Sequence, residues 1–123
     1  MLPYKETHVD VLGADYSIII SDPKTYPHLS ECNGYTDTYT KLIVVTDCSD
    51  FRDRPNSTGN VEAYQRKIIR HELIHAFLFE SGLDYCSTQP NSWATEEEIV
   101  DWFALQSPKI IKAFTDACCM EER

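Results

Sequence analysis

The feature that most constrains this chain is the segment from His71 to His75, which reads His-Glu-Leu-Ile-His within a helical pattern. Histidines four residues apart lie one above the other on the same face of an α-helix. In that arrangement both imidazole rings can bind one tetrahedral Zn²⁺. Glu72 lies about 100° around the helix from His71, so its carboxylate would stand beside the metal and could take a proton from a zinc-bound water. The alternative is a core helix with two hydrogen-bonded histidines and a surface glutamate.

The helix that carries this motif is predicted to begin at Val61, after a polar segment from Ser49 to Asn60 with the composition of a turn. Gly82 is well placed just past its end, where glycine readily adopts the left-handed conformation. From Ile68 to Phe79 the sequence is apolar nearly all round, which predicts a helix buried on most sides. Buried polar side chains are costly unless they are hydrogen-bonded or bind something, and this cost favours a metal site over a surface coincidence.

The third ligand decides the kind of site, because a catalytic zinc keeps one coordination position open whereas a structural zinc has four protein ligands. The two other histidines, His8 and His28, precede the motif, and none follows it. This excludes the zincin classes that use a later histidine. A carboxylate must therefore complete the set.

The candidate carboxylates lie in the segment from Trp93 to Ala104. Thr95 and Glu98 match a capping box, in which the threonine caps a helix and the glutamate reaches back to it. This gives Glu98 a structural role and leaves Glu97 as the candidate metal ligand. Asp101 follows Glu97 by one helical turn, so it can accept the N–H of a zinc-binding histidine. The helix dipole alone would also explain three glutamates in a first turn.

H-E-x-x-H followed some twenty residues later by E-x-x-x-D resembles the gluzincin arrangement of thermolysin-like metallopeptidases. The small size and the ending E-x-x-x-D-x-F-A are similar to compact zincins of the ImmA/IrrE type and to related phage-encoded metallopeptidases. The resemblance covers roughly Val61 to Ala113. It implies a minimal zincin-like fold and one Zn²⁺. The roles that it implies are metal ligand for His71, His75 and Glu97, general base for Glu72, and hydrogen-bond partner of a ligand for Asp101.

The segments before the motif helix predict a small sheet. Tyr16 to Ser21 and Lys41 to Thr46 are apolar, β-branched runs typical of strands. Asn33-Gly34 indicates a turn, and Gly34 to Thr40 could pair with the second run as a further strand of a meander. Val9 to Ala14 either begins the sheet or ends a short helix.

Two helices are expected after the motif helix. Trp102, Phe103 and Leu105 would dock the first of them on the motif helix. Ser107-Pro108 reads as the start of the second, which would run to about Met120. The predicted fold is α+β, a single domain over residues 1–123, with three or four strands packed on the motif helix and two further helices.

The net charge of −9 argues against binding to nucleic acid or to anionic membranes, because phosphate contacts need lysine and arginine. Met1 to Asp10 have no apolar signal-peptide core, and no apolar run approaches the roughly 20 residues of a membrane span. Five cysteines without an export signal fit reduced thiols, so we expect the cytoplasm of a bacterium or of a phage-infected cell. Cys32 and Cys48 do not have the spacing of a second metal site.

These observations predict a zinc-dependent endopeptidase, or peptide-bond hydrolase, whose partner is a protein or peptide substrate. An extended substrate would pair with an edge strand, for which the two segments between Tyr35 and Thr46 are candidates. Gluzincins stabilise the oxyanion with a tyrosine or histidine, and the candidates for that role are Tyr35, Tyr39, Tyr85 and His28.

Two other functions compete with the hydrolase. One is a zincin-like phage protein that retains the metal site but serves as a protein-binding module, against which the retention of Glu72 argues. The other is a protein whose zinc is only structural. That would need a fourth protein ligand, for which Cys86 is the residue to consider.

Overall fold

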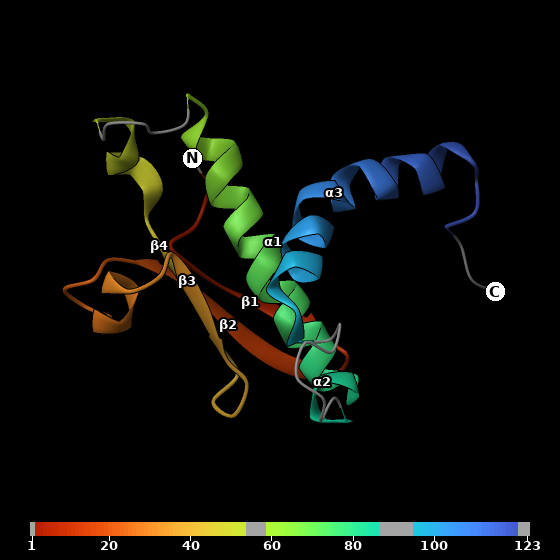
Figure 1. Cartoon of the computed structure of the whole chain (residues 1–123), viewed down its shortest axis with the longest axis horizontal. Coiled ribbons are helices and arrows are strands. Elements are labelled where there is room, and N and C mark those ends of the chain that lie inside the picture. Colours follow the sequence, from red (N-terminus) through yellow and green to blue (C-terminus); the bar gives the residue numbers. More distant parts are fainter. Residues whose placement is uncertain (1, 54–58, 87–94, 121–123) are drawn as a thin grey trace.

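The computed structural model describes residues 2–53, 59–86 and 95–120. Within these ranges the chain has the expected α+β architecture, a mixed sheet of four strands with helix α1 lying across it (Figure 1). The strands are β1 (Glu6–Val11), β2 (Ala14–Ser21), β3 (Gly34–Asp37) and β4 (Leu42–Thr46). The helices are α1 (Val61–Glu80), the short α2 (Leu83–Cys86) and α3 (Glu97–Asp116), and 3₁₀ turns occupy Pro27–Ser30 and Cys48–Asp53. None of the helices in these ranges combines the length and apolar character that a membrane crossing requires.

The strands are ordered β1-β2-β4-β3. β1 and β2 form an antiparallel hairpin whose turn residues Leu12 and Gly13 both have positive φ, as in a two-residue type I′ turn. β2 and β4 run parallel, and β3 pairs antiparallel with β4. The predicted pairing of β3 with β4 is therefore confirmed, but the sheet is not a meander, because β4 lies between β2 and β3. The open question about the first segment is settled, since β1 begins the sheet.

The hydrophobic core lies between the sheet and α1. Ile18 and Ile43 of the two central strands are buried and belong to the same cluster as Ile68, Ile69 and Ala76 of α1. These three positions follow the helical repeat, so they lie on one side of α1. The core thereby determines which face of the motif helix turns toward the sheet.

A buried glutamine fixes the start of α1 to the end of β4. The backbone N–H of Cys48 donates to Gln65 Oε1 at 2.8 Å, and Gln65 Nε2 donates to the carbonyl of Thr46 at 3.0 Å. Both ends of the amide are satisfied, which a buried polar side chain requires. The helix is therefore anchored two turns before its histidines.

Both ends of α1 lie where the sequence places them. Asn60 caps the first turn by accepting the N–H of Ala63 at 3.1 Å, and Gly82 has a φ of +86° just past the last turn. From Ile68 to Phe79 every residue is buried or partly buried except Phe77, which is 43% exposed, so the expectation of a helix covered on most sides is confirmed. The sheet and α3 each cover one face of α1.

The two predicted C-terminal helices are one continuous helix, α3, with Pro108 inside it. Proline has no N–H and so leaves the carbonyl four residues earlier without its helical donor. That carbonyl belongs to Ala104, and it accepts Arg70 Nε of α1 at 2.6 Å and Ser107 Oγ at 3.5 Å. Because another helix supplies the missing donor, the proline bends the helix rather than ending it. In Figure 1 the helix changes direction partway along its length.

The docking of α3 on α1 also differs from the prediction. Val100 and Ala104 are the buried residues of α3, one helical turn apart on the face toward α1. Trp102, Phe103 and Leu105, which were expected at this contact, are 53%, 44% and 53% exposed. A small alanine at the contact lets the two backbones approach closely. Phe103 lies at the edge of this contact, where it lines a groove with Ile74 and Phe77 of α1, whereas Trp102 and Leu105 lie on other faces of α3.

Candidate metal centre

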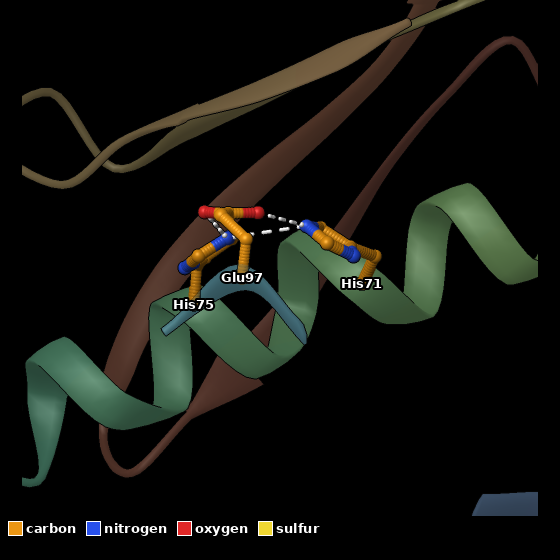
Figure 2. Close-up of side chains that lie close together, drawn as sticks. All are labelled: His71, His75 and Glu97. Carbon is orange, nitrogen blue, oxygen red and sulfur yellow. Dashed lines mark hydrogen bonds and ion pairs between the residues drawn. The ribbon is translucent and has the colours of Figure 1, made fainter. Parts of the chain in front are cut away.

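Three side chains from two helices converge at one point (Figure 2). His71 and His75 stand one turn apart on α1, and Glu97 is the first residue of α3. His71 Nε2 lies 2.9 Å from Glu97 Oε2 and 3.2 Å from His75 Nε2, and His75 Nε2 lies 2.9 Å from Glu97 Oε1. The geometry thus brings together the three residues that the sequence nominates as ligands.

These separations can be compared with those of a metal site. Ligand atoms bound to zinc at tetrahedral angles lie about 3.3–3.5 Å from one another, given typical bond lengths of 2.0–2.2 Å. The observed separations of 2.9 and 3.2 Å are within a few tenths of an ångström of that value. Among the described residues this is the one group of three or more histidine, cysteine or acidic side chains close enough to share an ion.

Asp101 lies behind the cluster, in the position expected from its spacing to Glu97. Its Oδ1 atom is 3.2 Å from His71 Nδ1. A carboxylate can only accept, so this contact requires a proton on Nδ1, and a neutral His71 then has its lone pair on Nε2, directed at the cluster. For the neutral ring, the aspartate therefore favours the tautomer with the proton on Nδ1.

Lys67 is a member of the site that the sequence prediction missed. Its ammonium group donates to Asp101 Oδ1 at 2.9 Å. This contact, with a smaller contribution from His71, holds the pKa of Asp101 below its usual value despite partial burial. Lys67 precedes His71 by one helical turn, so extending the i,i+4 pattern of the motif by one step would have found it.

Glu72 lies outside the cluster but close to it, on the side toward the sheet. Its side chain is buried, and Thr36 of β3 is 2.8 Å from Oε1 through its hydroxyl and 3.0 Å from the backbone carbonyl of the same residue. Burial raises the pKa of Glu72, while the Thr36 hydrogen bond and the two nearby histidines oppose that shift. Thr36 was not recognised in the sequence, because nothing local connects a threonine in a short strand to a helix 36 residues away.

Gly34 allows strand β3 to lie this close to α1. A Cβ atom at this position would be 3.1 Å from side-chain carbons of Ile68 and Val45, and 3.3 Å from Cγ of Glu72. The sequence suggested a turn at Asn33-Gly34, but Gly34 is the first residue of β3. Gly34 therefore does not reverse the chain. Its lack of a side chain lets β3 pack directly on α1 beside Glu72.

The cluster opens into a cleft of about 650 Å³ between α1 and β3. His28 and Tyr35 line the far wall and meet edge to face, with 4.8 Å between their ring centroids. Of the candidate oxyanion residues, these two reach the cleft, whereas Tyr39 is 84% exposed and contacts Phe79. The side chains of Tyr85 and Cys86 lie outside the described part of the structure.

The start of α3 differs by one residue from the predicted capping box. The N-cap is Glu96, not Thr95, and its side chain accepts the N–H of Glu98 at 3.2 Å. A longer side chain at the cap thus replaces the threonine, and the first helical residue becomes Glu97. Glu98 is exposed to solvent on the outer side of this turn.

Comparisons with models of protein families, with curated proteins and with solved structures give no match. Function is therefore inferred from the chemistry of the cleft, which brings together three possible ligand side chains, the buried Glu72 beside them and strand β3.

Proposed function

We propose that this chain is a zinc-dependent peptide-bond hydrolase of the gluzincin type. His71, His75 and Glu97 would hold one Zn²⁺, and Glu72 would be the general base. The observation that carries this proposal is the convergence of three possible ligand side chains between α1 and α3. In a neutral His71 with its proton on Nδ1, the lone pair of Nε2 would point at Glu97 Oε2, which is 2.9 Å away. Two acceptors at that distance repel each other unless a cation or a proton lies between them.

The donor set suits zinc. Two imidazole nitrogens and one carboxylate oxygen are the protein ligands of many catalytic zinc sites, which leave the fourth position open. All three side chains line the cleft, so a substrate could reach that position. When bound, Zn²⁺ supplies a Lewis acid that polarises a carbonyl and lowers the pKa of water.

Glu72 is suited to the proton transfers of hydrolysis. Burial raises its pKa, which makes the carboxylate a better base than an exposed glutamate. In the proposed mechanism it takes a proton from the attacking water and passes it to the departing amine. Thr36 holds one carboxylate oxygen and leaves the other available for this transfer.

Strand β3 is the proposed binding site for the substrate backbone. β4 is an interior strand, whereas β3 pairs only with β4 among the described strands, so its other edge can accept an extended peptide. Residues 34–36 of this strand line the same cleft as the histidines. Of the two segments nominated from the sequence, the geometry favours β3.

The alternative of a binding module that keeps its metal is less well supported. A carboxylate buried beside the histidines costs free energy that a purely structural or binding site has no need to bear. The costly feature is Glu72, which is 6% exposed. Its position beside the proposed ligands gives it a use in hydrolysis.

The test combines metal analysis with a search for cleavage. The purified protein should contain one zinc per chain, and a peptide library read by mass spectrometry should show cleavage that stops with a chelator and returns with zinc. Glu72→Gln should remove the cleavage and retain the zinc. A protein that binds no zinc would leave a protonated His71 as the explanation of the short contact to Glu97, and would overturn the proposal.

A further inference from the structure

The two faces of strand β3 carry different side chains. Thr36 points to α1, where its hydroxyl is 2.8 Å from Glu72 Oε1. Because side chains alternate along a strand, Tyr35 and Asp37 on either side of it point to the opposite face. His28 lies on that face as well, since it meets the Tyr35 ring edge to face. A peptide that extended the sheet beside β3 would therefore meet α1 on one side and these three residues on the other.

The backbone groups of β3 alternate between β4 and the open edge of the sheet. The N–H of Thr46 donates to the carbonyl of Asn33 at 2.8 Å, which makes these two residues a hydrogen-bonded pair. Such pairs alternate with non-hydrogen-bonded ones along an antiparallel ladder. Tyr35 and Asp37 are therefore bonded to β4, whereas the N–H and C=O of Thr36 point to the open edge. An antiparallel peptide would exchange two backbone hydrogen bonds with Thr36.

This register determines which side chains of the peptide meet which side chains of β3. The peptide residue opposite Thr36 would point toward α1 and the metal cleft. An antiparallel peptide would place the preceding residue opposite Asp37 and the following residue opposite Tyr35, both on the face away from α1. These two would be non-hydrogen-bonded pairs, in which the side chains of neighbouring strands come closest.

Tyr35 and Asp37 differ in the side chains that they can bind. The Tyr35 ring, held by its contact with His28, suits an aromatic side chain. Asp37 accepts the backbone N–H groups of Thr40 and Tyr39, each at 3.1 Å, and these bonds, chiefly those from Thr40, hold the pKa of Asp37 below its usual value. Because both donors are neutral, the carboxylate keeps its negative charge and can still attract a cation.

We propose that the cleft selects extended peptides in which a lysine or arginine stands two positions before an aromatic residue. The basic side chain pairs with Asp37, and the aromatic side chain packs on Tyr35. This selectivity rests on the proposed function, in which β3 receives the substrate. The net charge of −9 favours the approach of basic peptides in addition.

The experiment is the binding of fluorescently labelled peptides to the full chain, measured by anisotropy. The protein is treated with a chelator, so that binding is read without zinc and without cleavage. The peptides share a background of threonine and serine and differ at a central triplet, which reads Lys-Thr-Tyr, Glu-Thr-Tyr, Lys-Thr-Ser or the reversed Tyr-Thr-Lys. A cross-strand pair changes affinity by up to about fivefold, so the Lys-Thr-Tyr peptide should bind roughly two- to fivefold more tightly than each of the others.

Two variants assign the preferences to their residues. Tyr35→Thr keeps a strand-forming residue without the ring, and it should abolish the preference for Lys-Thr-Tyr over Lys-Thr-Ser. Asp37→Asn keeps an oxygen for the turn without the charge, and it should reduce the preference for Lys-Thr-Tyr over Glu-Thr-Tyr. The matched controls are Tyr39→Thr, an exposed aromatic on the turn between β3 and β4, and Asp10→Asn, whose carboxylate accepts a backbone N–H in the turn between β1 and β2. Both controls should keep the wild-type preferences, and circular dichroism checks that all variants are folded.

Equal binding of the four peptides would overturn the proposal, as would preferences that Tyr35→Thr and Asp37→Asn leave unchanged. Tighter binding of the reversed Tyr-Thr-Lys peptide would overturn the antiparallel direction. Cleavage of the same peptides by the zinc-loaded chain is measured separately. Selective binding without cleavage would contradict the hydrolase and leave the selectivity standing, whereas cleavage without selectivity would do the reverse.

Discussion

Replacing Thr36 by valine isolates one hydrogen bond that holds the proposed general base. Valine keeps the β-branched shape of threonine and its preference for strands but has no hydroxyl. In the native protein that hydroxyl is 2.8 Å from Glu72 Oε1, an atom of a buried carboxylate. The substitution therefore leaves a buried acceptor without its donor while it changes little else in the strand.

The expected cost follows from the charge of the acceptor. A hydrogen bond to a charged group contributes about 1.5–3 kcal/mol, and one to a neutral group about 0.5–1.5 kcal/mol. Thr36→Val should thus lower the free energy of unfolding of the metal-free protein by roughly 2 kcal/mol where Glu72 is ionised. Where Glu72 is protonated, the loss should fall to about 1 kcal/mol.

The sign of the pH dependence follows from the pKa of Glu72. Burial raises this pKa in the folded state, so the folded protein binds the proton more tightly than the unfolded chain does. The contribution of Glu72 to stability is therefore fully present below the unfolded pKa and is lost as the pH rises through the folded pKa. Because Thr36 stabilises the ionised form, its removal raises the folded pKa further. The difference between wild type and variant should consequently grow with rising pH.

The assay is urea unfolding of chelator-treated protein at several pH values between about 4 and 8, with Thr36→Ser as the control that keeps the hydroxyl. Thr36→Ser should stay close to wild type at every pH. If Thr36→Val matches wild type throughout, Thr36 does not hold the carboxylate. If its loss is constant with pH, the hydroxyl serves the backbone carbonyl of Glu72 instead of the side chain.

The remaining predictions concern the metal and the strand beside it. Glu72→Gln should keep the zinc content measured by atomic absorption but reduce peptide cleavage by about 10²–10⁴-fold, and zinc loss in this variant would make Glu72 a ligand. Glu97→Ala should lose zinc in a competition titration with a chromophoric chelator, whereas the neighbouring Glu98→Ala should bind as wild type does; the reverse result would move the ligand by one position. Asp101→Ala should weaken zinc binding by roughly 10–100-fold in the same titration, and unchanged affinity would leave the aspartate without a role at the metal. Gly34→Ala should lower stability in thermal unfolding by about 1–3 kcal/mol, because the added methyl meets Ile68 and Val45 at 3.1 Å, and an unchanged melting temperature would mean that β3 can move away from α1.

Features of this protein that depend on neighbours along the chain could be predicted from the sequence. The spacing of His71 and His75 puts both on one face of a helix whatever surrounds them, because the α-helix repeats every 3.6 residues. The same holds for Gly82 at the end of α1 and for the interval between Glu97 and Asp101, which places the aspartate one turn behind the ligand. The α+β class could also be predicted, since β-branched runs and helical periodicities are local signals.

What depends on contacts between distant segments was decided only by the tertiary structure. The position of Thr36 beside Glu72 and the salt bridge from Lys67 to Asp101 join residues more than 30 positions apart, and the parallel pairing of β2 with β4, which sets the order of the strands, joins residues 25 positions apart. No pattern in one segment encodes where another segment will pack.

Pro108 shows the limit of local rules most clearly. Read alone, Ser107-Pro108 starts a new helix, because proline suits a first turn and disrupts a helix interior. In the folded chain Arg70 donates to the carbonyl that the proline leaves without a partner, and the helix continues through it. The sequence alone thus determined the helical face that bears the histidines. Only the folded arrangement of α1 and α3 decided that Glu97 meets those histidines, because this contact follows from packing between segments that are distant in the sequence.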